Sequence, residues 1–365
     1  MQSTATVTTI AIDLAKNVFQ LALADRDLRV FRSLRLRRKE FLAFWSNYPV
    51  VQVVMEACGS AHHFGRWVSA LGHRVTLLPA QHVYRRRRNK TDAIDCVALL
   101  EALRAADIRP VPIKTESQQV IQMLHRARQQ WQKMRTAQIN LARGALREFG
   151  IAVPEGAARA VACMRAEQAN AQLDPMIRGL LQSLLEEIAM LERRVADVDR
   201  QFAAASRTDV VLHKLQTLPG IGWVTASAIR ASVGDIERFA NARSFSAWIG
   251  MTPAQTASGD KRKLGRSKQG DTYVRTLVIQ GARAVLAAAQ RQRLTTRPLS
   301  APGHWAATLA DRRGFNKAAV GSGQQAAAYC RRNQKVPIKG RIDDCTDPAS
   351  TIRSTSKRLT WGRSP

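Results

Sequence analysis

Short apolar runs alternate with helix-like segments over the first 110 residues of the chain. The strand-like runs, bounded by polar or turn residues, are residues 7–15, 18–25, 29–36, 50–57 and 73–80. Helical patterns cover residues 60–72 and 91–107, with Ser60 and Thr91 as candidate N-caps. Three antiparallel strands, a strand–helix–strand unit and a further helix predict a mixed α/β domain.

The apolar period changes between residues 111 and 208. One segment alternates spacings of four and three, broken by Gln138 at one seam position, and its apolar members are Val120, Leu124, Ala127, Trp131, Met134, Leu141 and Ala145. A second segment keeps the same rhythm at Ile177, Leu181, Leu184, Ile188, Leu191, Val195, Val198 and Phe202. Sustained heptads predict coiled-coil helices. An intramolecular hairpin and a dimer stalk both satisfy this pattern, and the sequence favours neither.

A third kind of sequence pattern begins at Leu215. The segment "LPGIG" places Gly220 and Gly222 in a tight turn before a helix that starts near Val224. This pattern resembles a helix-hairpin-helix element, in which backbone N–H groups at a helix start meet a DNA phosphate. An ordinary interhelical turn has the same sequence signature, so both interpretations stay open. A polar loop and a helix from about Asp271 follow.

The charge of the chain narrows the class of partner. Its 365 residues are 45% hydrophobic, enough for two or three packed parts, and the formal net charge is +29. Positive charges in such excess repel one another unless a polyanion binds to the surface. The charge therefore favours nucleic acid as the partner. No run of about 18 apolar residues predicts a membrane span, and the N-terminus lacks a signal-peptide pattern. Five scattered cysteines without a CxxC pair indicate a reducing compartment and oppose a structural zinc site.

Four acids form the candidate catalytic group. Asp13 and Glu56 each lie at the end of an apolar run, and Asp92 and Asp95 share one helix face. Taken singly, each has an ordinary explanation, such as a first-turn charge or a partner for arginine. As a set they favour Mg²⁺, which prefers oxygen ligands and serves phosphodiester chemistry in pairs. The cations that come directly before Asp92 and Asp95 in the sequence are Arg85, Arg86, Arg87, Arg88 and Lys90.

These motifs carry a family resemblance. "AIDLAKN", "MEACGS" and "NKTDAID", in this order, resemble the DEDD (RuvC-like) transposases of the insertion-sequence family numbered one hundred and ten, relatives of the pilin-gene invertase. "LPGIG", "RFANARSFSAWIGMTPAQTASGDKRKLGRSKQGD" and "RTLVIQGARAVL" resemble the C-terminal domain of that family. The similarity covers about residues 7–320.

The resemblance implies a fold that is α/β plus α. We expect an RNase H-like (RuvC-like) catalytic domain at residues 1–110 and a coiled-coil helical linker at 111–208. A mostly helical transposase domain with a helix-hairpin-helix-like element follows at 209–320. After Val320 the resemblance stops, and we hypothesise a shifted reading frame. Residues 321–365 are accordingly expected to form a divergent, disordered tail.

The resemblance also implies roles for individual residues. Asp13, Glu56, Asp92 and Asp95 become the catalytic tetrad, holding two Mg²⁺ ions, and Ser258 becomes the nucleophile. By the residues alone, Ser258 ranks beside Ser267 as a loop serine. Cations near the serine would favour the charge that develops on phosphorus, and they are Lys261, Arg262, Lys263, Arg266 and Lys268.

The implied function is that of a transposase or site-specific recombinase acting on DNA, guided by a structured noncoding RNA. A homodimer or homotetramer suits paired strand exchange, in the bacterial cytoplasm at the nucleoid and away from membranes. Three alternatives stay open: a RuvC-like metal-dependent junction nuclease that needs no serine, a non-catalytic nucleic-acid-binding protein, and an actin-like kinase. The kinase lacks support, because the chain has no second glycine-rich phosphate loop and is strongly basic.

Overall fold

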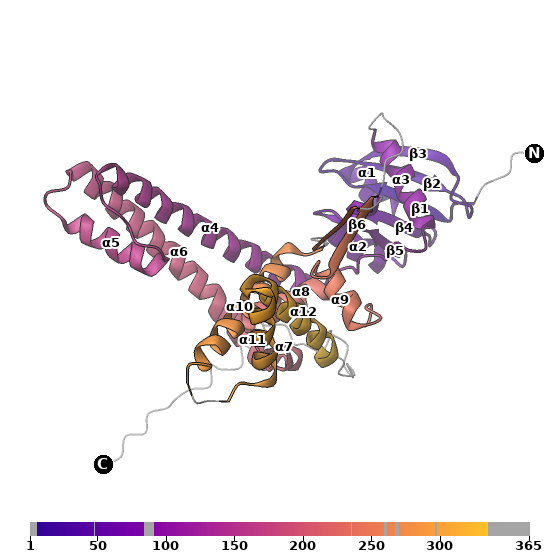
Figure 1. The fold of residues 1–365 in the computed structure, drawn as a ribbon. Coiled ribbons are helices and arrows are strands. Elements are labelled where there is room, and N and C mark those ends of the chain that lie inside the picture. The colour runs from indigo at the N-terminus through magenta and orange to yellow at the C-terminus, as the bar shows by residue number, and fades with distance from the viewer. Residues whose placement is uncertain are drawn as a thin grey trace, which may run out of the picture. The chain divides into compact units, whose positions relative to one another are not determined.

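The computed structural model describes residues 6–46, 48–83, 91–234, 236–258, 261–266, 270–295 and 298–334 (Figure 1). The chain forms two compact units. The first unit comprises residues 1–205 and 224–235, and the second comprises residues 206–223 and 236–365.

A five-stranded sheet organises the start of the first unit. Its spatial order is β3-β2-β1-β4-β5, built from β1 (Thr9–Asp13), β2 (Val18–Ala24), β3 (Val30–Arg37), β4 (Gln52–Glu56) and β5 (Arg74–Leu78). The first three strands pair antiparallel, whereas β4 lies parallel to both β1 and β5. The mixed sheet predicted from the sequence is therefore present, and each strand lies inside its predicted run except β3, which ends one residue later, at Arg37.

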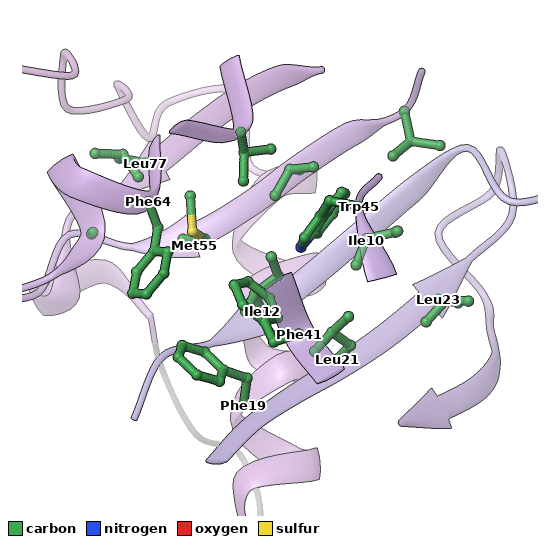
Figure 2. Packing of buried hydrophobic residues seen from close by; sticks show 14 residues of the cluster. Ile10, Ile12, Phe19, Leu21, Leu23, Phe41, Trp45, Met55, Phe64 and Leu77 are labelled. Carbon is green, nitrogen blue, oxygen red and sulfur yellow. The ribbon is translucent and has the colours of Figure 1, made fainter. Parts of the chain in front are cut away.

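Aromatic packing covers one face of this sheet. Helices α1 (Arg38–Phe44) and α2 (Ala61–Ala70) bring Phe41 and Phe64 onto strand residues such as Phe19. The rings of Phe19 and Phe41 stack with centroids 4.2 Å apart, and Figure 2 shows both residues within this cluster. Large fully buried side chains of this kind contribute roughly 2–3 kcal/mol each to folding by removal from water. This packing holds the sheet in place, and the candidate site lies on the opposite face of the sheet.

The opposite face is lined by small residues beneath one helix. Ala11, Ala22 and Ala24 form a second core with α3 (Asp92–Arg104), whose Cys96 and Leu99 are buried. Because the side chains are methyl groups, α3 can approach the strands closely. Since successive strand residues point to opposite faces, every second residue of β1, β2 and β4 lies on this α3 face.

A pair of long antiparallel helices forms the other part of the first unit (Figure 1). Helix α4 (Glu116–Glu148) packs along α6 (Pro175–Thr208), and α5 (Ala157–Ala169) contributes to the same core. On α6 the predicted seam is the packed face, with Leu181, Leu184, Ile188, Leu191, Val198 and Phe202 buried. On α4 the predicted seam is not the packed face. There, Val120, Met134 and Leu141 are exposed, and His125, Ile139, Ala142 and Leu146 are buried instead.

Cross-helix polar pairs explain the face that α4 selects. Arg128 makes a bidentate contact with Asp199, at 2.6 and 3.1 Å. Arg135 donates to Glu192 at 2.8 Å, and the His125 ring stacks on Phe202 with centroids 4.1 Å apart. A count of apolar spacings along α4 cannot register these partners, because they lie about 60 residues later in the chain.

The second unit is mostly helical. It contains α7 (Val210–Gln216), α9 (Ala242–Trp248), α10 (Thr272–Gln292), α11 (Ala301–Arg313), α12 (Phe315–Gln334) and the hairpin of β6 (Pro253–Ser258) and β7 (Lys261–Arg266). Helix α8 (Trp223–Val233) follows the turn after α7 and, from Val224 onward, belongs to the first unit. Helix α10 begins where the sequence predicts, and Asp271 is its N-cap, accepting from the backbone N–H groups of Tyr273 and Val274.

The segment that was expected to be disordered from residue 321 is helical as far as Gln334. Ala319, Gly323, Ala327 and Cys330 lie on one side of α12, and all four are buried. Ser246 also donates to the carbonyl oxygen of Gln324 at 3.3 Å. The expectation of disorder is therefore wrong for residues 321–334, because small residues at helical spacing pack there. Residues 335–365 lie outside the described part of the chain.

Candidate catalytic site

The ends of two neighbouring parallel strands place the first two candidate acids. Register pairs Ile12 of β1 with Met55 of β4, so the next positions on the two strands are Asp13 and Glu56. Adjacent strands lie about 4.8 Å apart. Ala11 and Val54 belong to the α3 core, and by alternation Asp13 and Glu56 lie on that same face. Both acids are half-buried.

The first turn of α3 supplies the other two candidates. Thr91 caps the helix, its hydroxyl accepting from the backbone N–H of Ile94 at 3.4 Å. The cap fixes where the helix begins and thereby sets Asp92 and Asp95 in its first turn, where negative charge is favoured. Asp92 is exposed, whereas Asp95 is half-buried.

Cys96 connects these two pairs of acids. It is fully buried, and its Sγ donates to the carbonyl oxygen of Gln20 at 3.2 Å. Gln20 is the register partner of Asp13 across β1 and β2. Burial raises the pKa of the Cys96 thiol to about 12, and the negative charges of Asp13, Asp95 and Asp92 act in the same direction. Three of the four acids are therefore near enough to the Cys96 thiol to raise its pKa, and Glu56 lies on the strand beside Asp13.

These acids have the chemistry of a hard divalent ion site. All four offer carboxylate oxygens, the ligands that Mg²⁺ prefers, and they come from adjacent elements on one face of the sheet. Within the described ranges, however, no three His, Cys, Asp or Glu side chains converge closely enough to hold an ion. The donor set fits the metal in kind and comes from adjoining elements, but the side chains as placed do not form a coordination shell.

Arg38 supports the loop that follows Asp13. Its guanidinium donates to the carbonyl oxygen of Lys16 at 3.1 Å, and its backbone N–H donates to that of Asn17 at 3.1 Å. The same guanidinium lies over the Phe19 and Phe64 rings, 6.0 and 5.5 Å from their centroids. Arg38 is not among the candidate site residues that the sequence predicts. It sits in a run of basic residues that carries no local signal of this role.

A second group that the sequence analysis did not single out joins α2 to the start of α4. The Nδ1 atom of His62 accepts from the backbone N–H of Lys114 at 3.2 Å, and Arg66 donates to the Lys114 carbonyl oxygen at 2.6 Å. Burial lowers the pKa of His62 to about 4, and the positive charges of Lys114, Arg66 and Arg126 lower it further. The contacts span about 50 residues of sequence, so no local motif could predict them.

The candidate nucleophile lies at the tip of the β6–β7 hairpin. Ser258 is the last residue of β6, and register pairs it with Lys261, the first residue of β7. The sequence predicts a polar loop here, whereas the structure has two paired strands on either side of residues 259 and 260, which lie outside the described part of the chain. A Gly-Asp pair between two strand-forming segments was the available signal. The described part of β7 contains Lys261, Arg262, Lys263 and Arg266.

Other predicted nucleic-acid contacts lie outside the described residues. These are Arg85, Arg86, Arg87, Arg88, Lys90 and Lys268. The turn glycines are described and differ from each other. Gly220 has a φ of +84° and abuts the backbone of Gly281, whereas a Cβ on Gly222 would meet nothing within 4 Å. The tight turn of Gly220 thus has a packing role.

Among the residues that the structure describes, no helix is both long and apolar enough to cross a bilayer.

Two family models match the chain. Residues 10–151 match the DEDD model of the IS110 group, described as "Transposase", and residues 212–297 match "Transposase IS116/IS110/IS902 family". The DEDD match suggests an RNase H-like fold for the sheet domain, whose mixed strand order agrees with it.

Curated proteins resemble the chain over most of its length. A probable family 20 transposase of Pseudomonas aeruginosa is 40% identical over 316 residues, covering 85% of this chain and 92% of the relative. The transposase for insertion sequence element IS1111A of Coxiella burnetii is 36% identical, covering 85% of each. The transposase for insertion sequence element IS1328 of Yersinia enterocolitica is 34% identical, covering 77% of this chain and 84% of the relative.

Proposed function

Because this chain belongs to the IS116/IS110/IS902 family of transposases, enzymes that cut and transfer DNA strands, we propose that it does so with an acidic tetrad and a serine nucleophile. The proposed tetrad is Asp13, Glu56, Asp92 and Asp95, and the proposed nucleophile is Ser258. The DEDD domain implies a divalent metal. We assign it to the tetrad as two Mg²⁺ ions.

One observation supports the tetrad most strongly. Asp13 and Glu56 end neighbouring parallel strands on the α3 face, and the capped first turn of α3 brings Asp92 and Asp95 to that face. Carboxylates that share one face of a sheet in this way would be favoured by a bound cation, which offsets their mutual repulsion. Metal bound there would supply positive charge to the phosphate oxygens and lower the cost of charge developing on them.

The Ser258 hydroxyl carries the covalent step of the proposal. Its oxygen forms a bond to phosphorus of a DNA phosphodiester while the bond from phosphorus to one deoxyribose oxygen breaks. The serine proton leaves to solvent or a nearby base, and the departing deoxyribose oxygen gains a proton. Reversal of the same exchange by another DNA hydroxyl rejoins the strand and regenerates the serine. The positive charge of Lys261 and Arg262 beside the turn favours the anionic transition state.

The partners follow from the same proposal. DNA is the substrate, and a structured noncoding RNA selects it, as the family resemblance implies. A net charge of +29 suits two polyanionic partners. The arginine run at 85–88 and Lys90, together with Lys263, Arg266, Lys268 and the Gly220–Gly222 turn, are proposed phosphate contacts. We propose that the protein acts as a homodimer or homotetramer at the bacterial nucleoid.

An adduct assay tests the proposal directly. Protein, Mg²⁺, candidate guide RNA and labelled element-end DNA are incubated, and a denaturing gel reveals protein-linked DNA. We expect an adduct with the wild type and none with Ser258→Ala or Asp92→Ala. Ser267→Ala, a serine nine residues away in the same basic stretch, is the matched control and should retain the adduct.

The same assay distinguishes the alternatives. If Ser258→Ala cuts DNA normally while Asp92→Ala does not, the enzyme is a metal-dependent nuclease acting through water, and the serine proposal is wrong. If Asp13→Ala and Asp92→Ala both leave function intact, the tetrad has no catalytic role and the chain only binds nucleic acid.

A further inference from the structure

Strand β3 forms one edge of the five-stranded sheet, and its two faces differ in chemistry. Leu34 and Leu36 pack against the aromatic core on one side of the sheet. By alternation, Ser33, Arg35 and Arg37 lie on the opposite side, the face that carries α3 and the candidate acids. All three are exposed. The outer strand therefore adds two cations to the face on which the acids lie.

The strand register sets Arg35 level with Asp13. Asp13 pairs with Gln20 across β1 and β2, and Gln20 pairs with Arg35 across β2 and β3. Two steps between neighbouring strands separate the Cα atoms of Arg35 and Asp13 by about 10 Å. Arg37 follows one pleat farther on the same face, about 7 Å from Arg35. The two arginines thus form a row beside the acids.

Helix α3 leaves this row open. The helix packs on β1, β2, β4 and β5, and the side chains that β3 presents on the α3 side stay exposed. Gln20, between Asp13 and Arg35, carries no charge, and its amide donates to the Ser33 hydroxyl at 2.7 Å. Among the residues that the structure describes, the Arg35 guanidinium has no hydrogen-bond or ion-pair partner. Its charge is therefore available to a ligand.

Protection of the sheet edge is the ordinary explanation for charged residues on an outer strand, because they hinder pairing with another sheet. Arg32 fits that explanation and lies on the aromatic side. There, burial raises the pKa of Tyr48, the positive charge of Arg32 opposes that rise, and Tyr48 packs against the aromatic core. Edge protection gives Arg32 and Arg35 the same role, whereas a binding site beside the acids involves Arg35 alone.

A nucleic-acid strand that approaches the acids brings negative charge to a negative face. In the proposed function two Mg²⁺ ions balance the four carboxylates, so the phosphates beside the reacting one need cations from elsewhere. Successive phosphates of one DNA strand advance about 3.4 Å along the axis, so about 10 Å between Arg35 and Asp13 covers about three nucleotides. A guanidinium suits such a phosphate, because its parallel N–H donors match two phosphate oxygens.

We propose that Arg35, with Arg37 next to it, binds a backbone phosphate of the DNA strand that is cut, within about three nucleotides of the reacting phosphate. The inference rests on the proposed tetrad and adds a substrate-binding site that the sequence motifs do not contain. The contact holds the strand across the face of the sheet on which the acids lie. Because it is made to phosphate, it strengthens the binding of every DNA sequence alike.

Binding of element-end DNA by the full chain with its candidate guide RNA tests the site. Affinity is measured at several salt concentrations in Ca²⁺ without Mg²⁺, so that the readout is binding and not strand cleavage. We expect Arg35→Gln to weaken binding about tenfold near 0.15 M salt and to lower the slope of log affinity against log salt by about 0.9. Arg32→Gln, which removes the same charge from the other face of β3, is the matched control and should bind like the wild type. Unchanged circular dichroism and unfolding midpoints show that both variants are folded.

Neutral linkages in the DNA locate the contact. A methylphosphonate replaces one charged phosphate at a time on either side of the cut bond, and each DNA is bound by the wild type and by Arg35→Gln. At the phosphate that Arg35 holds, the neutral linkage should weaken the wild type and leave the variant unchanged, because the contact is already lost. Hydroxyl-radical scission by Fe²⁺ bound in place of Mg²⁺ marks the nucleotides nearest the tetrad without any catalytic step.

Two results would overturn the phosphate site. One is equal affinity and salt slope for Arg35→Gln and Arg32→Gln, and the other is coupling only at phosphates more than about three nucleotides from the marked position. If Arg35→Gln weakens the binding of guide RNA alone by the same factor, the site belongs to RNA instead. Failure of the proposed function looks different: neither the wild type nor Arg32→Gln cuts DNA in Mg²⁺, and Asp92→Ala leaves the Fe²⁺ scission pattern unchanged.

Discussion

Gly220 and Gly281 meet through their backbones. A Cβ on Gly220 would lie 2.8 Å from the carbonyl carbon of Gly281, and a Cβ on Gly281 would overlap the carbonyl oxygen of Gly220. The contact joins the turn after α7 to the middle of α10, both in the second unit. A glycine in mid-helix ordinarily costs stability, and here it permits the closest approach of two segments.

Gly281→Ala should therefore destabilise the second unit, although the same change in an exposed helix stabilises by roughly 1 kcal/mol. We expect a loss of about 2–3 kcal/mol from overpacking against backbone that cannot move aside, measured as a lower midpoint of thermal unfolding. Gly222→Ala, two residues from Gly220 but facing open space, should change stability by less than about 0.5 kcal/mol. Equal effects of the two substitutions would show that the close contact is not formed.

The Arg128–Asp199 pair should contribute measurably to the pairing of α4 with α6. Its side chains are 12% and 27% exposed and the contact is bidentate, so we expect a coupling energy of about 1 kcal/mol from a double-mutant cycle with alanine. The matched control is the exposed Arg200–Asp197 pair, where the coupling should be close to zero because water screens it. A coupling near zero for both pairs would contradict the proposed reason for the face that α4 selects.

His62 should make the first unit less stable in mild acid. Its folded pKa of about 4 lies below the unfolded value of 6.5, so the unfolded chain takes up the proton first as the pH falls. The stability is complete above about pH 6.5 and declines between there and pH 4. We expect His62 to account for about 1–2 kcal/mol of this loss, well below full conversion of the shift, because water screens a half-buried ring.

His62→Asn is the matching variant, since its side-chain oxygen can accept the Lys114 N–H in place of Nδ1. Urea unfolding at pH 7 and pH 5 should show a smaller difference in the variant than in the wild type. An identical difference would mean that other groups cause the acid sensitivity.

Mg²⁺ should stabilise the first unit through the tetrad. Ligand at about 100 times its Kd adds roughly 2.7 kcal/mol to the folded state, which is visible as a rise in the unfolding midpoint. We expect Asp95→Asn to abolish most of that rise, and Asp107→Asn, an exposed acid just after α3, to preserve it. If both variants respond to Mg²⁺ like the wild type, the ion binds elsewhere. The readout is independent of DNA cleavage.

Local sequence signals predicted the elements around the site well. Alternating apolar positions located all five strands of the sheet, Thr91 caps its helix as the sequence indicates, and α10 begins at the predicted position. Ser60 occupies the N-cap position of α2 but makes no capping hydrogen bond from its side chain. These features depend on a few neighbouring residues, so a sequence pattern can encode them.

Long-range choices could not be predicted in the same way. The heptad count on α4 selected a seam that contains Val120, Met134 and Leu141, whereas the structure packs the other face through Arg128 and Asp199. Two apolar rows of equal period compete there, and only partners distant in sequence decide between them. The contact of His62 with Lys114 has the same origin. An apolar period alone shows that a helix has an apolar face. Where a helix has two such faces, the period does not show which one packs in the core.

The alanine layer beneath α3 has a consequence for how this enzyme can fail. Half of the proposed acids sit on a helix whose height above the strands is set by three methyl groups, those of Ala11, Ala22 and Ala24. A larger side chain at any of these alanines would push α3 away from the strands and displace Asp92 and Asp95, although all four acids would still be present. A transposase with such a substitution would keep all four proposed acids in its sequence and yet be inactive. Dormant copies should thus be sought among substitutions of small buried residues as well as among lost acids.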